Sequence, residues 1–268
     1  MAEFPSLRRK REGITLGRRL GQHFLARKSV LDNIAEAACE QDAPLVIEIG
    51  AGRGALTECL LERAQKVIAI EVDPILIPYL NQKFADAIAA GRLTIVEGDI
   101  LKTDLGAWGP APIVGNLPYY ITSPILERTF ATKTATQAVF LMQAEVATRV
   151  CAGPSSRDYG YLSAVAQVQS HPERLFEVPA AAFRPPPKVE SAVVRFTPRD
   201  PAADFGVTDV PKFLRFAGVC FRQKRKTLRN NLAAAYPKEI VDALPEGRLR
   251  AEQLPVAELA RLSRLFES

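Results

Sequence analysis

Short apolar runs alternate with segments of helical periodicity along the first 200 residues of the chain. Uninterrupted runs bounded by turn residues are typical of buried strands, and they lie at residues 45–49, 67–70, 93–96, 113–114, 138–142 and 191–196. Between them, apolar residues recur every three or four positions, as in residues 30–38 and 56–61, which predicts amphipathic helices. The pattern therefore predicts strands and helices in alternation.

This alternation predicts a fold of the α/β class, a parallel sheet with helices on both faces. The run at 191–196 comes late, after a cluster of three prolines, and we expect it to form an antiparallel edge strand. Helical spacing resumes after a loop-like stretch around 198–204. We therefore expect a flexible basic arm over 1–20, a sheet domain over 21–200 and a small all-helical C-terminal domain over 205–268.

The composition excludes several classes of protein. Of the 268 residues, 47% are hydrophobic and 24% are charged, as in soluble globular proteins. No apolar run approaches the roughly 20 residues that cross a bilayer, and none follows the basic N-terminus as in a secretory signal. We expect a cytoplasmic protein without a membrane segment; Glu3 and Glu12 count against the alternative of a mitochondrial transit peptide. The four cysteines form no Cys-x-x-Cys pair and there are two histidines, so we expect neither disulfides nor a metal site.

The net charge of +5 is distributed unevenly along the chain. Residues 1–28 carry +6, residues 29–200 carry −5 and residues 201–268 carry +4. Positive segments attract a polyanion, and phosphate contacts supply much of the affinity for nucleic acid. Charge alone leaves two interpretations open, a nucleic-acid partner or a solvated surface with a basic tail.

A glycine-rich turn follows the first predicted strand and reads Glu-Ile-Gly-Ala-Gly-Arg-Gly over residues 48–54. Gly50 and Gly52 permit a sharp turn from strand to helix and a close approach of a ligand to the backbone. Such a turn alone can serve NAD, FAD or S-adenosylmethionine. The spacing here is G-x-G-x-G, whereas the dinucleotide fingerprint is G-x-G-x-x-G. The acid Glu48 is tolerated where no pyrophosphate binds, so the turn favours S-adenosylmethionine.

Acidic residues end the next two predicted strands. Glu71 lies 21 residues after Gly50, and a carboxylate there can accept both hydroxyl groups of a ribose. Asp99 follows the third strand, where it can accept a hydrogen bond from the amino group of the cofactor's adenine. Ligands of open α/β sheets bind at the carboxyl ends of the strands, so the three segments together predict a methyl-donor site.

The segment Asn116-Leu117-Pro118-Tyr119 follows the fourth strand. The side-chain oxygen of Asn116 and the carbonyl of Leu117 can each accept one hydrogen of adenine's exocyclic amino group, which aims the nitrogen lone pair at the methyl group. Pro118 stiffens the turn, and Tyr119 can stack on a base extruded from its helix. Phe183, in the proline-stiffened segment 183–189, is expected to cover the other face of the base. The alternatives are an ordinary turn and a plain linker.

These motifs resemble the ribosomal RNA adenine N6,N6-dimethyltransferases, in particular the small-subunit (16S) enzymes. The resemblance covers nearly the whole chain and is carried by residues 21–25, 48–54, 71, 98–99, 116–119, 183–189, 191–194 and 225–228. It implies a class I Rossmann-like methyltransferase domain with a helical C-terminal domain. It also implies that two adjacent adenines in a hairpin loop near the 3′ end of small-subunit rRNA are dimethylated while the 30S subunit matures.

The resemblance also assigns binding residues. It implies contacts with S-adenosylmethionine at His23, Leu25, Gly50, Glu71, Asp99 and Asn116. This first segment often reads Gln-Asn-Phe-Leu in the family, so the role of the His23 side chain stays open. Contacts with rRNA phosphates are expected from a basic C-terminal helix carrying Arg222, Lys224, Arg225, Lys226 and Arg229. A monomer is expected.

Three other functions remain as alternatives. The first is the large-subunit rRNA methyltransferase that confers macrolide resistance, from which the segment Pro-Pro-Pro-Lys-Val-Glu-Ser-Ala-Val-Val (185–194) distinguishes this chain. The second is a non-catalytic binding protein of the same family, against which Asn116 and the intact glycine loop argue. The third is an NAD oxidoreductase, which the glycine spacing disfavours.

Overall fold

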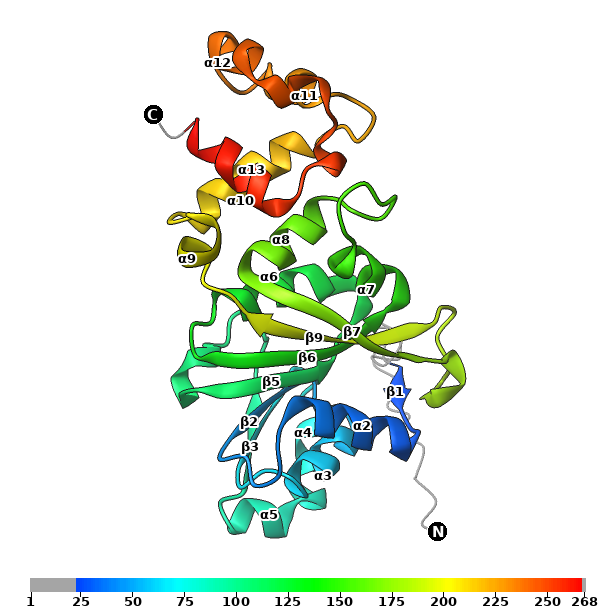
Figure 1. The fold of residues 1–268 in the computed structure, drawn as a ribbon. Coiled ribbons are helices and arrows are strands. Elements are labelled where there is room, and N and C mark those ends of the chain that lie inside the picture. Colours follow the sequence, from blue (N-terminus) through cyan, green and yellow to red (C-terminus); the bar gives the residue numbers. More distant parts are fainter. Residues whose placement is uncertain (1–22, 267–268) are drawn as a thin grey trace, which may run out of the picture.

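The core of the protein is a seven-stranded sheet in the order β4-β3-β2-β5-β6-β9-β7, seen in a computed structural model that describes residues 23–266. The strands from β4 to β6 are parallel, whereas β9 runs antiparallel to both of its neighbours (Figure 1). The strands are β2 Val46–Ile49, β3 Val67–Glu71, β4 Leu93–Glu97, β5 Ala111–Asn116, β6 Ala135–Gln143, β7 Ser170–Val178 and β9 Ser191–Pro198. The α/β prediction is confirmed, and the arm expected over 1–20 lies outside the described residues.

Helices cover both faces of the sheet because its central strands are apolar on both sides. Val46 of β2 joins the hydrophobic cluster under α2, α3 and α4, and its neighbour Ile47 joins the cluster under α6 and α7. A strand buried on both faces needs an uninterrupted apolar run, which is the signal read in the sequence. The helices of this part are α2 Lys28–Ala38, α3 Ala55–Leu61, α4 Leu76–Lys83, α5 Ala85–Ala89, α6 Thr122–Ala131, α7 Ala144–Cys151 and α8 Tyr161–Gln169.

The far edge of the sheet differs from the prediction. The run at 191–196 forms an antiparallel strand, β9, but β9 lies between β6 and β7 and is not the edge. The edge strand on this side is β7, in which only the end residues Ser170 and Val178 are buried and which contains Pro172. An edge strand needs no continuous apolar run and tolerates proline, so the sequence pattern missed it. A two-stranded ribbon, β1 Phe24–Leu25 with β8 Phe183–Arg184, was missed as well.

The C-terminal part is helical, as predicted, and packs on the sheet part through α8. Its apolar cluster is centred on buried residues such as Phe213, Leu228 and Leu259, and it includes Ala164 and Val168 of α8. The packing therefore runs across the boundary expected near residue 205 (Figure 1). The helices of this part are α9 Pro201–Phe205, α10 Val210–Cys220, α11 Leu228–Leu232, α12 Lys238–Ala243 and α13 Val256–Arg264.

Candidate active site

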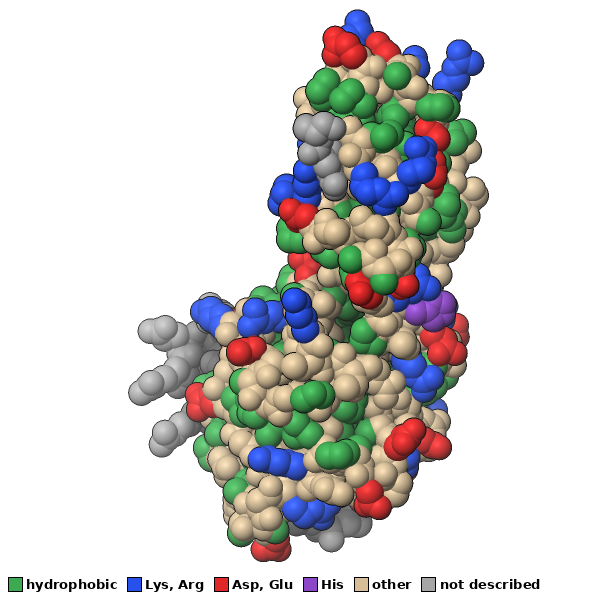
Figure 2. Space-filling model, turned by 60° about the vertical axis from the view of Figure 1, so that its left-hand side comes forward, with side chains coloured by type: hydrophobic (Ala, Val, Ile, Leu, Met, Phe, Trp, Pro, Cys, Tyr) green, Lys and Arg blue, Asp and Glu red, His purple; other side chains and the backbone are tan. Residues whose placement is uncertain are grey.

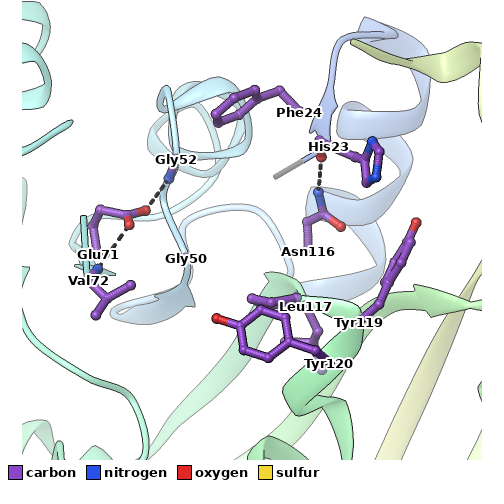
Figure 3. Close-up of a pocket in the computed structure, with 11 residues that line it drawn as sticks. His23, Phe24, Gly50, Gly52, Glu71, Val72, Asn116, Leu117, Tyr119 and Tyr120 are labelled. Carbon is purple, nitrogen blue, oxygen red and sulfur yellow. Dashed lines mark hydrogen bonds between the residues drawn. The ribbon is translucent and has the colours of Figure 1, made fainter. Parts of the chain in front are cut away.

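A pocket opens at the carboxyl ends of β2, β3 and β5, where parallel strands deliver their following loops to one edge of the sheet (Figure 3). Most of the predicted site residues meet here. The lining comes from His23, Phe24, Gly50, Gly52, Glu71, Val72, Asn116, Leu117, Pro118, Tyr119 and Tyr120. An adjoining cavity shares Phe24, the two glycines and Asn116 with this pocket and is also lined by Leu25.

The glycine loop forms one wall of the pocket. Gly50 and Gly52 have φ angles of +76° and +57°, in the left-handed region that residues with a Cβ rarely adopt. A Cβ on Gly52 would lie 3.3 Å from the ring of Phe24. The absence of side chains at these two positions therefore keeps the loop in its turn and leaves its backbone accessible to a ligand.

Glu71 ends β3 and links that strand to the glycine loop. Its Oε2 accepts the N–H of Gly52 at 2.7 Å, and its Oε1 accepts the N–H groups of Val72 and Asp73 at 2.9 and 2.8 Å. A carboxylate offers about four lone-pair positions, and these bonds use three of them. One acceptor position on Oε2 remains, which fits one ligand hydroxyl; accepting both hydroxyls of a ribose, as predicted, requires Gly52 to give up its bond.

Asn116 lies at the end of β5, and its amide is oriented by a main-chain acceptor. Its Nδ2 donates to the carbonyl oxygen of His23 at 3.1 Å. Because a carbonyl can only accept, the amide nitrogen must face His23 and the amide oxygen must face away from it (Figure 3). Among residues 23–266 that oxygen has no hydrogen-bond donor. The main chain of Leu117 donates to Leu141, and the Leu117 carbonyl is likewise without a described donor.

Two consecutive tyrosines flank the amide of Asn116 (Figure 3). Tyr119 is anchored by a 2.7 Å hydrogen bond between its hydroxyl and Oγ of Ser191, and burial raises the pKa of this hydroxyl. Tyr120 is 62% exposed and lies on the Glu71 side of the pocket. Tyr120, Phe24 and Val72 line the pocket and were missed from the sequence; each directly adjoins a residue that was singled out, and this adjacency was the available signal.

Besides Leu25, which lines the adjoining cavity, Asp99 and Phe183 were predicted for the site but do not line this pocket. Asp99 follows β4, and its Oδ1 accepts the N–H of Leu101 at 3.0 Å, so half of its carboxylate caps its own turn. Phe183 pairs with Leu25 in the β1–β8 ribbon and is completely buried in the core. A ring without exposed surface offers no face to a base. The buried position of Phe183 therefore does not support the stacking role that was predicted for it.

The basic C-terminal residues were expected to lie along a helix. All but Arg229, which is in α11, instead lie in the connection between α10 and α11. Arg222, Arg225 and Lys226 are exposed there. The ammonium of Lys224 instead donates to the carbonyl of Arg157, and Arg229 lies 3.6 Å from the carboxylate of Asp242. On the face of the molecule in Figure 2, Lys and Arg side chains are interspersed with Asp and Glu.

Glu48 of β2 is a buried acid beside the glycine loop. It is 1% exposed, and its Oε2 accepts the hydroxyl of Thr57 at 2.5 Å. Burial raises the pKa of Glu48 from 4.5 to about 7, and the bond from Thr57 opposes the rise. Between about pH 4.5 and pH 7 the folded protein therefore keeps a proton on Glu48 that the unfolded chain loses. The free energy of unfolding consequently falls as the pH rises through this range.

Glu48→Gln is expected to remove this pH dependence, because the neutral amide stays uncharged at every pH. Between pH 5 and pH 8 the free energy of unfolding of the wild type should fall relative to the variant by at most about 3 kcal/mol. Urea denaturation at both pH values measures the difference. Glu36→Gln, at an exposed position of α2, is the matched control and should track the wild type. Parallel pH profiles for wild type and Glu48→Gln would contradict the assignment.

The described residues contain no group of three or more His, Cys, Asp or Glu side chains that could hold a metal ion. Within the same residues, no helix is long and apolar enough to cross a membrane.

The mostly parallel sheet, the glycine loop and the pocket are those of a Rossmann-like methyltransferase, and solved structures of such enzymes have the same fold. One is a dimethyladenosine transferase from Plasmodium falciparum, with a TM-score of 0.77 and 26% identity over 90% of this chain and 96% of that one. Another is the 23S rRNA methyltransferase ErmE, with a TM-score of 0.70 and 25% identity over 91% of this chain and all of that one.

The particular family follows from the sequence comparisons. A family model described as ribosomal RNA adenine dimethylase matches residues 14–267. A relative from Acidobacterium capsulatum, named ribosomal RNA small subunit methyltransferase A, is 44% identical over 93% of this chain and 90% of its own length. A relative of the same name from Xanthomonas euvesicatoria is 42% identical over 91% of this chain and 94% of its own length. The chain belongs to the ribosomal RNA adenine dimethylase family.

Proposed function

We propose that this protein transfers methyl groups from S-adenosylmethionine to N6 of two adjacent adenines in a hairpin loop near the 3′ end of 16S rRNA, as the 30S subunit matures in the cytoplasm. Family membership supports the rRNA adenine as target, and the names of the relatives above support the small subunit. The observation that carries the mechanism is the amide of Asn116, whose nitrogen is held by His23 and whose oxygen is left for a ligand.

The Glu71 side of the pocket fits the methyl donor. When bound, S-adenosylmethionine supplies an electrophilic methyl group on a positively charged sulfur. Glu71 keeps one free acceptor position for a ribose hydroxyl, and Gly50 and Gly52 let the donor approach the main chain closely. Leu25 contributes through the adjoining cavity, and Asp99 retains one carboxylate oxygen for the donor's adenine amino group.

The Asn116 side of the pocket fits the adenine that is methylated. The amide oxygen of Asn116 and the carbonyl of Leu117 accept the two hydrogens of the N6 amino group, while Tyr119 stacks on the ring. Holding both hydrogens points the nitrogen lone pair at the methyl carbon. The N6–carbon bond forms as the sulfur–carbon bond breaks, and one proton leaves N6 for solvent. Pro118 has no N–H that could compete for these acceptors.

The helical part supplies contacts with rRNA phosphates. Arg222, Arg225 and Lys226 are exposed and have no described partner, whereas Lys224 and Arg229 already have partners within the protein. We assign the phosphate contacts mainly to the first three residues. Such contacts position the RNA without reading its sequence, so binding should weaken as salt rises. We propose a monomer that acts on an immature 30S particle, without a metal.

Transfer of labelled methyl groups tests the proposal. The protein is incubated with labelled S-adenosylmethionine and small-subunit particles that lack the modification, with large-subunit particles and bare RNA in parallel. Label recovered as dimethyladenine from the small-subunit particles alone is the expected result. Label on the large subunit would reassign the target, and measurable donor binding without any transfer would favour a non-catalytic binding protein.

A further inference from the structure

The first residue of β9, Ser191, lies at the edge of the sheet that carries the pocket. Because β9 runs antiparallel to β6, Ser191 pairs with Gln143, the last residue of that strand. On its other side it pairs with Val178, the last residue of β7. The carbonyl before it, that of Glu190, accepts the N–H of Ala144 at 3.0 Å. The main chain of Ser191 is therefore held by neighbours on both sides.

The hydroxyl of Ser191 is buried and depends on Tyr119 for a partner. Ser191 has no exposed surface, and a buried hydroxyl that lacks a hydrogen bond destabilises the fold. Among residues 23–266, the hydroxyl of Tyr119 is the single hydrogen-bond partner of its Oγ, at 2.7 Å. Since Tyr119 follows β5, and β6 lies between β5 and β9, this bond passes over the end of one strand. It joins two segments that are 72 residues apart in the chain.

The bond to Ser191 connects one wall of the pocket to the main sheet. Tyr119 itself lies in a short turn of 3-10 helix, Tyr119–Ile121, so strand pairing does not hold its main chain. Its side chain turns about two torsions, and a bond at the far end of the ring restricts both. Because the hydroxyl is engaged and burial raises its pKa, Tyr119 presents its ring to the pocket and not a base (Figure 3).

We propose that Ser191 is a positioning residue for methyl transfer, whose hydroxyl holds the ring of Tyr119 in the orientation on which the target adenine stacks. This role rests on the proposed function above. A ring that is already in place stacks on the base without first being ordered, and the acceptors of Asn116 and Leu117 then meet the amino edge. Ser191 acts through Tyr119 alone, since it is buried and lines neither the pocket nor the adjoining cavity.

A double-mutant cycle of Ser191→Ala and Tyr119→Phe tests this assignment, because each variant removes one hydroxyl of the pair. Methyl transfer to small-subunit particles gives kcat/KM for the particle, calorimetry with S-adenosylhomocysteine gives donor affinity, and urea denaturation gives stability.

The matched control is Ser170→Ala. Ser170 is also a buried serine at the start of a strand, β7, and its Oγ donates to the carbonyl of Ala166 at 2.7 Å. It pairs with Pro198, the last residue of β9, and so lies at the end of the sheet opposite to Ser191. The control therefore loses a comparable buried hydrogen bond away from the pocket.

Each single variant should lower kcat/KM for the particle about 3- to 10-fold, the effect of one hydrogen bond. The double variant should lie within about twofold of either single variant, because the second substitution has no bond left to remove. Donor affinity should stay within about twofold of the wild type in all three. Ser170→Ala should lose about as much stability as Ser191→Ala and yet transfer methyl groups within about twofold of the wild type.

Two results would overturn the role of Ser191 and leave the proposed function intact. One is transfer by Ser191→Ala, or by Tyr119→Phe if the first variant does not fold, at the rate of the Ser170 control. The other is a double variant in which the two losses multiply, because the hydroxyls would then act separately. A wild type that transfers no methyl group would instead refute the proposed function, and the role of Ser191 with it.

Discussion

Asn116→Ala is expected to lower kcat for methyl transfer about 100- to 1,000-fold, as removal of a preorganised polar group does in other active sites. The alanine cannot accept a hydrogen from the amino group, so the nitrogen lone pair is no longer aimed at the methyl group. The variant also loses the bond to the His23 carbonyl, whereas the Gly52–Glu71 bond does not involve Asn116 and should persist. Single-turnover transfer to small-subunit particles measures the rate, and calorimetry with S-adenosylhomocysteine measures donor affinity.

The matched control for this variant is Asn81→Ala. Asn81 also donates its amide to a main-chain carbonyl, that of Ile77 at 3.0 Å, but it is exposed on α4. Its loss should leave the rate within about twofold of the wild type, since exposed substitutions of this kind change little. An Asn116→Ala protein that bound donor and methylated at the rate of the Asn81 control would contradict the mechanism.

Gly115→Ala is expected to destabilise the whole sheet by about 2–4 kcal/mol, in the range of overpacking in a closed core. Gly115 lies in β5 between β2 and β6, and a Cβ there would stand 2.5 Å from the main-chain oxygen of Ile49. That oxygen belongs to a neighbouring strand and cannot move aside like a flexible side chain. Urea denaturation measures the loss, and the adjacent Asn116 should lose activity in the same variant.

Gly153→Ala is the control for the effect of an added methyl group. Gly153 lies in the loop after α7, its φ is not positive, and a Cβ there meets nothing within 4 Å. Its stability should stay within about 0.5 kcal/mol of the wild type. If Gly115→Ala unfolded at the same urea concentration as Gly153→Ala, the close approach of β2 and β5 at this position would be wrong.

Local patterns were sufficient for most of the sheet and, together with the family resemblance, for eight of the eleven residues that line the pocket. The central parallel strands β2, β3 and β5 are largely continuous apolar runs because they are buried on both faces, and such runs are readable without knowledge of their neighbours. Gly50 follows β2, and Glu71 and Asn116 end β3 and β5, so their meeting at one edge follows from the parallel arrangement alone. The strand β7 carried no such signal, because only its first and last residues are buried.

The sequence by itself therefore determined the fold class, the family and the set of residues at the strand ends, because these depend on periodicity and on motifs of adjacent residues. Only the tertiary structure decided which ring faces Tyr119. Phe183 and His23 are 160 residues apart, and the pairing of β1 with β8 buries the phenylalanine while it brings the imidazole to the pocket. Contacts between such distant segments depend on how the chain packs as a whole, and no local pattern of residues records them.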